Sequence, residues 1–216
     1  MQPNLVSPPP WQLTGDGVVL LYHFPDEFNK QYSFMADYQQ QAYKGWVGAV
    51  MMVDYKTSGV GPYRELIFIP GLFDLNGKLS FSISKIYVST YDSVWNGIQN
   101  WGIPKELADF SVATYADGTK EFEVSKNDKT FFEASLKPFG IRLPITTKVL
   151  PLVRVIQQLR DQLLLTRLDA RGQTQLSSLK SIYSDASFFP PVHQLKPLVS
   201  MSVHDFLMTF PVPTVL

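Results

Sequence analysis

The sequence contains no cysteine. Disulfide bonds, a catalytic thiolate and a metal ion held by cysteine are therefore excluded. Histidine is scarce as well: His23, His193 and His204 lie far apart along the chain. Their spacing matches none of the common histidine metal-binding motifs. We therefore expect neither a metal site nor another cofactor.

The chain also lacks an excess of charge of either sign. It has 19 lysines plus arginines and 19 aspartates plus glutamates, and no window holds a run of like charge. Nucleic-acid-binding proteins present a basic patch or stripe to the phosphates. We therefore expect no nucleic-acid partner.

Long apolar runs are missing too. The longest candidates are residues 18–22 and 66–69, far below the about 20 residues that a helix needs to cross a bilayer. The N-terminus has neither a basic start nor an apolar stretch of signal-peptide length. These absences predict a cytoplasmic protein without a membrane partner.

What is present indicates a globular protein. Hydrophobic residues make up 45% of the 216 positions and aromatic residues 13%, which argues against disorder. A chain of this length can bury roughly 70% of its unfolded surface. We expect one domain over residues 1–216, beginning with an extended arm of residues 1–11. The arm holds four prolines and ends on Trp11, which we expect to dock on the body.

Short runs rich in β-branched and aromatic residues alternate with turn residues along most of the chain. Asn76-Gly77 has the composition of a hairpin turn. Such regular spacing predicts an antiparallel meander that can close into a barrel. The predicted strands are residues 18–22, 46–55, 63–69, 79–89, 110–115, 120–124 and 130–136, and residues 203–210 form a strand or a short helix.

Helical periodicity occurs in fewer places. Residues 26–42 have aromatic residues and methionine three and four positions apart, which predicts an amphipathic helix with Asp26 as its cap. Residues 91–101 are expected to form a short irregular or helical piece. The leucines of residues 157–168 also have helical spacing.

Two charged residues lie inside apolar segments bracketed by glycine and proline. Glu65 belongs to the predicted strand 63–69, where period two places it on the same face as Tyr63. Lys105 follows Pro104. By composition alone, Glu65 fits a strand carboxylate paired with a lysine or arginine, and Lys105 fits a surface lysine.

A set of motifs gives a second interpretation of both residues. The turn Thr57-Ser58-Gly59 precedes Glu65 by six positions counted from Gly59, and Gly97 leads into Pro104-Lys105. This arrangement resembles the acetoacetate decarboxylase superfamily. The resemblance implies that Lys105 forms a Schiff base with a keto acid and that Glu65 shuttles protons or orients the substrate.

The same resemblance implies an α+β fold that is mostly β. It implies a closed, cone-like antiparallel β-barrel with a few short helices, assembled into a homo-oligomer. An apolar outward strand face that includes Leu66 and Phe68 would suit such an assembly. The resemblance also favours two strands at residues 163–169 and 174–183, joined by a turn at 170–172, over the helical pattern described above.

Several positions differ from the superfamily pattern. Glu106 replaces a second lysine, Ile98-Gln99 replaces an Arg-Glu pair, and Val50 falls at the position of a second pocket glutamate. Asp16 falls at the position of an arginine proposed to hold the substrate carboxylate. If Glu106 faced the site, its charge would favour the ammonium form of Lys105. In an extended backbone the two side chains instead point apart.

Imine formation requires an uncharged amine, so the lysine must sit where its charged form is disfavoured, as acetoacetate decarboxylase itself illustrates. Here desolvation by Trp101 and the barrel wall would supply this effect, with Tyr63 in the pocket. The sequence therefore predicts a Schiff-base-forming carbon–carbon lyase acting on a small keto or β-keto acid by decarboxylation or by aldol or dehydration chemistry. The alternative is a non-catalytic barrel that binds a small apolar or carboxylate-bearing ligand.

Overall fold

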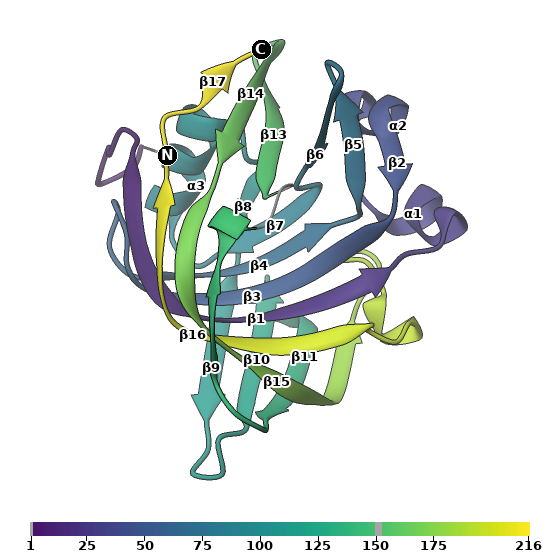
Figure 1. The fold of residues 1–216 in the computed structure, drawn as a ribbon, viewed down its shortest axis with the longest axis vertical. Coiled ribbons are helices and arrows are strands. Elements are labelled where there is room, and N and C mark those ends of the chain that lie inside the picture. The colour runs from purple at the N-terminus through teal and green to yellow at the C-terminus, as the bar shows by residue number, and fades with distance from the viewer. Residues whose placement is uncertain (1, 150–152) are drawn as a thin grey trace.

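The computed structural model describes residues 2–149 and 153–216 (Figure 1), so Met1 of the expected arm lies outside the described residues. Strands dominate these ranges and form two sheets. Three α-helices accompany them in the described part of the chain: α1 (Asp26–Tyr32), α2 (Asp37–Ala42) and α3 (Tyr91–Trp101). Two short 3-10 helices are also present, η1 (Thr147–Val149) and η2 (Val192–Gln194).

The larger sheet has eleven strands and is strongly curled (Figure 1). Its strand order begins with β8 (Lys105–Leu107), β7 (Lys85–Val88), β4 (Tyr63–Ile69), β3 (Val47–Thr57) and β1 (Trp11–His23). It continues with β16 (Val199–Phe210), β15 (Asp169–Ser184), β11 (Lys129–Pro138), β10 (Lys120–Lys126) and β9 (Asp109–Thr114), while β12 (Leu143–Thr146) pairs with β15.

This sheet is open, whereas the sequence predicted a closed barrel. Its two edge strands, β8 and β9, form no ladder with each other in the described residues. Only Ala108 separates them in sequence, and its amide still donates to the carbonyl of Val88 on β7. Because a single residue cannot turn the chain back on itself, β9 cannot pair with the strand that leads directly into it. The mostly β architecture is confirmed and the closed barrel is not.

The smaller sheet has six strands: β17 (Thr214–Val215), β14 (Gln162–Arg167), β13 (Arg154–Leu159), β6 (Lys78–Phe81), β5 (Leu72–Leu75) and β2 (Tyr43–Gly45). The Asn76-Gly77 turn joins β5 to β6 with both residues at positive φ, as the type I′ hairpin requires. The single strand expected at residues 79–89 is wrong, because the chain leaves β6 and enters β7 of the other sheet. Ser82 lies between them and is hydrogen-bonded to Gln39 and Gln157.

The helix expected over residues 26–42 is also wrong as one unit. The helix is interrupted between α1 and α2, where Phe34 has a φ of 53° and the Ser33 hydroxyl donates to the carbonyl of Asn29. The N-cap of α1 is Pro25, not Asp26. The helical alternative for residues 91–101 is confirmed by α3.

The leucine-rich segment after residue 153 forms strands, so its helical spacing is misleading. Arg160 and Asp161, both at positive φ, turn β13 into β14. The turn expected at residues 170–172 is wrong, because β15 runs through it. In place of a turn, β15 has a register shift against β16 between Arg171 and Gln173. Residues 203–210 belong to β16, in the middle of the larger sheet.

Side chains on the two faces of the central strands β1, β3 and β4 build two separate cores. Strands β10 and β11 of the same curled sheet pack over one face, and α3 and β13 cover the other (Figure 1). The Phe68 core includes Leu20, Tyr22, Val50, Met52, Leu66, Phe68 and Phe132. The Trp101 core includes Trp11, Tyr55, Tyr63, Ile67, Trp101, Ile103 and Val155.

This arrangement corrects the expectation that Leu66 and Phe68 face outward. Both are fully buried in the Phe68 core, because the far end of the same sheet folds over them. They therefore contribute nothing to a subunit interface. Trp11 is buried, as expected for the docked end of the arm.

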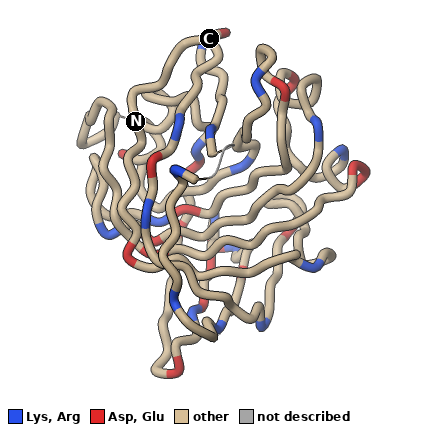
Figure 2. Tube along the Cα trace, in the orientation of Figure 1, with Lys and Arg blue, Asp and Glu red and all other residues tan. Residues whose placement is uncertain are grey.

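Charged residues of both signs are scattered along the chain trace, with no region reserved for one sign (Figure 2). This distribution agrees with the equal numbers of acidic and basic residues. Each helix in the described ranges is too short or too polar to span a bilayer.

Candidate active site

The C-terminal end of α3 directs Lys105 back onto its own helix. Gly102 ends α3 in the left-handed region at a φ of 68°, which glycine adopts without strain. The amide of Ile103 then donates to the carbonyl of Gly97, and β8 begins at Lys105. A Cβ atom on Gly97 would lie 2.6 Å from the Lys105 Cδ atom. Glycine at position 97 thus leaves room for the lysine side chain to lie against the helix.

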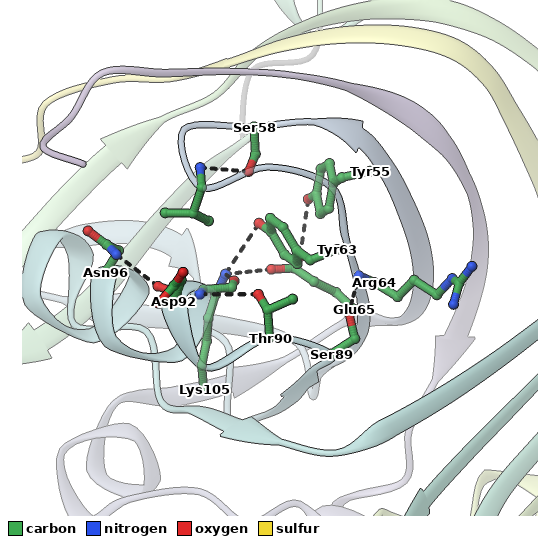
Figure 3. A network of polar contacts seen from close by, with 12 residues as sticks. Tyr55, Ser58, Tyr63, Arg64, Glu65, Ser89, Thr90, Asp92, Asn96 and Lys105 are labelled. Carbon is green, nitrogen blue, oxygen red and sulfur yellow. Dashed lines mark hydrogen bonds and ion pairs between the residues drawn. The ribbon is translucent and has the colours of Figure 1, made fainter. Parts of the chain in front are cut away.

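The amine of Lys105 is buried and has three hydrogen-bond acceptors around it (Figure 3). Its Nζ atom donates to Glu65 Oε1 at 2.6 Å, to Ser93 Oγ at 2.9 Å and to the Tyr63 hydroxyl at 3.4 Å. The Lys105 and Glu65 side chains are only 4% and 5% exposed. Water is therefore nearly excluded from this ion pair.

The second carboxylate oxygen of Glu65 accepts a hydrogen bond from a tyrosine. The Tyr55 hydroxyl donates to Glu65 Oε2 at 3.1 Å. Burial, together with the charge of Glu65, raises the pKa of both Tyr55 and Tyr63 well above the ordinary value of a tyrosine. Both hydroxyls therefore keep their protons at neutral pH and act as fixed dipoles beside the Lys105–Glu65 pair.

The pair borders a cavity of about 90 Å³ inside the Trp101 core. One water needs about 10–15 Å³ on this scale, so the cavity has room for roughly six to nine non-hydrogen atoms. That is the size of a small keto acid. Apart from the pair and two tyrosines, its lining is apolar and includes Ile67, Ile86, Trp101 and Ile103.

Aromatic side chains fix the wall of the cavity next to α3. The Trp101 ring packs edge-on against Trp11, with centroids 5.0 Å apart, and against Phe210 at 4.8 Å. Its indole nitrogen donates to the carbonyl of Pro211 at 2.8 Å. Gly59 of the Thr57-Ser58-Gly59 turn allows Trp11 to approach, because a Cβ at that position would lie 2.5 Å from the Trp11 indole nitrogen.

No protein-family model matches the sequence, and no curated protein matches it. Solved structures do match. An acetoacetate decarboxylase from Legionella pneumophila subsp. pneumophila str. Philadelphia 1 superposes with a TM-score of 0.72 at 16% identity, over 97% of this chain and 88% of its own. The chain has the acetoacetate decarboxylase-like fold.

Two other solved structures share this fold. The enduracididine biosynthesis enzyme MppR, complexed with pyruvate, has a TM-score of 0.70 at 16% identity, over 98% of this chain and 91% of its own. An acetoacetate decarboxylase-like enzyme from Sphingomonas wittichii RW1 has a TM-score of 0.71 at 10% identity, over 98% and 94%.

Within this acetoacetate decarboxylase-like fold, Glu106 lies outside the Lys105 site. Successive residues of β8 point to opposite faces, and Glu106 binds Lys85 at 2.5 Å and Lys126 at 2.8 Å. Burial alone would raise the pKa of Glu106, but the hydrogen bonds from Lys126 and Lys85 outweigh it and hold the pKa below its ordinary value. The charge of Glu106 is thus neutralised on the opposite face of the strand.

Two positions inferred from the resemblance also lie away from the cavity. Val50, expected at the place of a pocket glutamate, is buried in the Phe68 core, because it alternates with Met51, which lines the cavity. Asp16, expected at the place of an arginine, pairs with Lys56 at 2.8 Å. Neither residue takes part in the Lys105 site.

The structure brings Lys105, Glu65, Tyr63 and Trp101 together around one cavity. Sequence reasoning missed Ser93, which contacts Lys105. A cue was available: Ser93 is in the first turn of the helix that precedes Lys105, twelve residues away. The link between Tyr55 and Glu65 had a similar cue, because both lie on paired strands close in sequence.

No group of three or more potential metal-ligating side chains is found within residues 2–149 and 153–216.

Proposed function

We propose that this chain is a Schiff-base-forming carbon–carbon lyase that acts on a small keto or β-keto acid through Lys105. One observation carries the proposal: the Lys105 amine is buried against Glu65 at 2.6 Å and borders a cavity sized for such a substrate. The acetoacetate decarboxylase-like fold supports it.

Lys105 can attack a ketone only as an uncharged amine. The 2.6 Å hydrogen bond to Glu65 supplies a direct route for its extra proton. Proton transfer converts the buried ion pair into a neutral amine and a neutral carboxylic acid. Burial makes this transfer less costly than it would be in water, because the charged pair has lost its hydration. Glu65 would thus activate the nucleophile.

The chemistry then follows in balanced steps. Neutral Lys105 adds to the ketone carbon, and the ketone oxygen leaves as water after taking up protons, one of them from Glu65. The resulting protonated imine accepts the electron pair of a neighbouring bond, which breaks to release carbon dioxide, a proton or an aldehyde. When an aldehyde leaves, the proton of its former hydroxyl passes to the Glu65 carboxylate. The enamine is reprotonated at carbon. Water finally hydrolyses the imine and frees Lys105.

The solved relatives of this fold support the substrate class. MppR has been solved with pyruvate and with the condensation product of pyruvate and imidazole 4-carboxaldehyde. Both ligands belong to the chemistry of small keto acids. We propose the same class for this chain.

Borohydride trapping tests the proposal. The protein is incubated with pyruvate or acetoacetate, reduced with borohydride and weighed by intact-protein mass spectrometry. We expect a permanent adduct that disappears in Lys105→Ala. Lys85→Ala is the matched control, because Lys85 also pairs with a glutamate but lies outside the cavity; its adduct should persist. An adduct that survives in Lys105→Ala would contradict the proposal.

A second candidate function is non-catalytic binding of a small apolar or carboxylate-bearing ligand. The three acceptors around the Lys105 amine favour it, because they occupy the hydrogens of the nitrogen that must react. Calorimetric binding of pyruvate or a fatty acid, with an unmodified mass after borohydride across a panel of ketones, would support this alternative.

The single domain over residues 1–216, homo-oligomeric assembly and a cytoplasmic location stay predictions from the sequence. Light scattering coupled to size-exclusion chromatography measures the assembly directly.

A further inference from the structure

A second cavity lies beside the Lys105 cavity. Its volume is about 210 Å³, more than twice that of its neighbour. Four side chains line both spaces: Met51, Tyr55, Leu168 and Met208. Tyr55 is also the residue whose hydroxyl holds Glu65. The larger cavity, called the side chamber below, is therefore separated from the reacting groups by only one layer of side chains.

The lining of the side chamber is almost wholly apolar. Its other members include Val19, Val53, Val203 and Phe206, together with small residues such as Ala170. Polar side chains are few: Thr146, Thr147 and Arg171, of which Arg171 is exposed. No described residue places a carboxylate in it. Such a space accepts hydrocarbon, and Arg171 at its exposed edge is the one basic side chain among the described residues that line it.

The Lys105 cavity lacks a second cation. Lys105 is the one basic residue among the described side chains that line it, and Glu65 neutralises that charge. A keto acid held there finds no arginine for its carboxylate, so another part of the molecule has to supply binding free energy. Apolar surface moved out of water is a sufficient source.

We infer that the substrate is a keto acid with an unbranched alkyl chain, whose carbonyl carbon meets Lys105 and whose chain extends past Met51 and Met208 into the side chamber. This inference rests on the proposed function and names its substrate class. Methionine suits the passage between the two spaces, because its unbranched side chain adjusts readily to a neighbouring hydrocarbon. On the scale used for the Lys105 cavity, the added volume has room for a chain of up to roughly fourteen carbons at about 15 Å³ for each atom.

Chain length is the variable to test. Pyruvate, 2-oxobutyrate, 2-oxohexanoate, 2-oxooctanoate and 2-oxodecanoate are each titrated against the protein, trapped with borohydride and measured by intact mass. We expect the concentration for half-maximal labelling to fall about fourfold with each added methylene until the chamber is filled. Lys105→Ala again reports whether the adduct is on the correct lysine.

A chamber-filling variant ties the effect to this cavity. Val203→Phe adds bulk from β16 into the side chamber, and Val203 does not line the Lys105 cavity. We expect the ratio of 2-oxooctanoate to pyruvate labelling to fall at least tenfold. Val199→Phe is the matched control, because it makes the same change on the same strand outside both cavities; its ratio should equal that of the unaltered protein. Ala170→Leu, from β15, serves as a second filling variant if Val203→Phe does not fold.

The outcomes separate the two proposals. Labelling that rises with chain length and is lost in the filling variant supports the inference. Two results overturn the inference and keep the proposed function. One is labelling of Lys105 that does not depend on chain length. The other is a ratio of 2-oxooctanoate to pyruvate labelling that neither Val203→Phe nor Ala170→Leu changes. A protein that no oxo acid labels overturns the proposed function and the inference with it.

Discussion

Two neighbouring residues of β8 enter two different lysine–glutamate clusters, one on each face of the strand. Lys105 pairs with Glu65 inside the Trp101 core, where both side chains are at most 5% exposed. Glu106 pairs with Lys85 and Lys126, and its own side chain is 38% exposed. The same two kinds of charged group therefore meet once in a nearly water-free site and once in a partly solvent-exposed site.

The difference shows how surroundings decide the role of an ion pair. In the dry cluster each charge depends on its partner, and transfer of one proton removes both charges. In the half-exposed cluster water screens the charges, so the interaction is weak and mainly keeps Glu106 ionised. A reactive amine is expected in the buried cluster, whereas the partly exposed cluster has only a structural role.

Removing one partner of the dry pair should have the largest effect. Glu65→Ala leaves a buried ammonium group without a counter-charge, and we expect the free energy of unfolding to fall by about 3–5 kcal/mol. Urea denaturation followed by tryptophan fluorescence measures it. The double variant Lys105→Met with Glu65→Leu removes both charges and should recover most of the loss. If the single variant lost less than 1 kcal/mol, the description of a dry, mutually dependent pair would be wrong.

Crowding the dry cluster should have the next largest effect. Gly97→Ala places a methyl group 2.6 Å from the Lys105 Cδ atom, so the lysine has to move away from Glu65. We expect a loss of about 1–3 kcal/mol in stability and slower borohydride labelling with pyruvate. Gln99→Ala, on the exposed side of the same helix, is the control and should label at the unaltered rate. Equal labelling rates for the two variants would refute the close packing.

A lysine at position 106 tests the independence of the two faces. Glu106→Lys introduces the second lysine of the superfamily pattern, but the side chain would join Lys85 and Lys126. We expect a loss of about 1 kcal/mol from like-charge repulsion, reduced by screening, and a labelling rate within twofold of the unaltered protein. Faster labelling would show that position 106 acts on Lys105 across the strand.

The smallest expected effect is the loss, in acid, of the stability that the pairing of Glu106 contributes. The pKa of Glu106 is lowered from 4.5 in the folded chain, so its pairing contributes stability that is complete above about pH 4.5. That contribution is lost as the pH falls through the lowered pKa. We expect Glu106→Gln to be less stable by under about 1 kcal/mol at pH 7, with the difference between the two proteins shrinking as the pH falls below 4.5. A difference that grew on acidification would have the wrong sign.

The local sequence pattern predicted the positions of most strands better than it predicted how the strands are arranged in the sheets. The strand over residues 63–69 matches β4, and its alternation places Glu65 with Tyr63 as observed. The Asn-Gly hairpin and the meander of β9, β10 and β11 were also predictable. The leucine spacing of residues 157–168 failed, because a strand covered on both faces and a helix can share the same apolar pattern.

The candidate site was predictable only in part for a related reason. Residue types and the resemblance pointed to Lys105 and Glu65, which lie 40 positions apart in sequence. Ser93 was missed because a serine in a helix has no distinctive pattern until its neighbour in space is known. The position of Glu106 depended on whether the backbone at residue 105 was extended, which only the register of β8 with β7 settled.

By itself the sequence determined the alternation of side chains along each strand, since that follows from backbone geometry at every second residue. It also determined that a charged lysine and glutamate would stand among apolar neighbours. Tertiary structure alone decided that the sheet stays open, that Leu66 and Phe68 turn inward, and that Ser93 and Glu65 meet at one amine. Those outcomes depend on how distant segments pack against each other, and no local period encodes that packing.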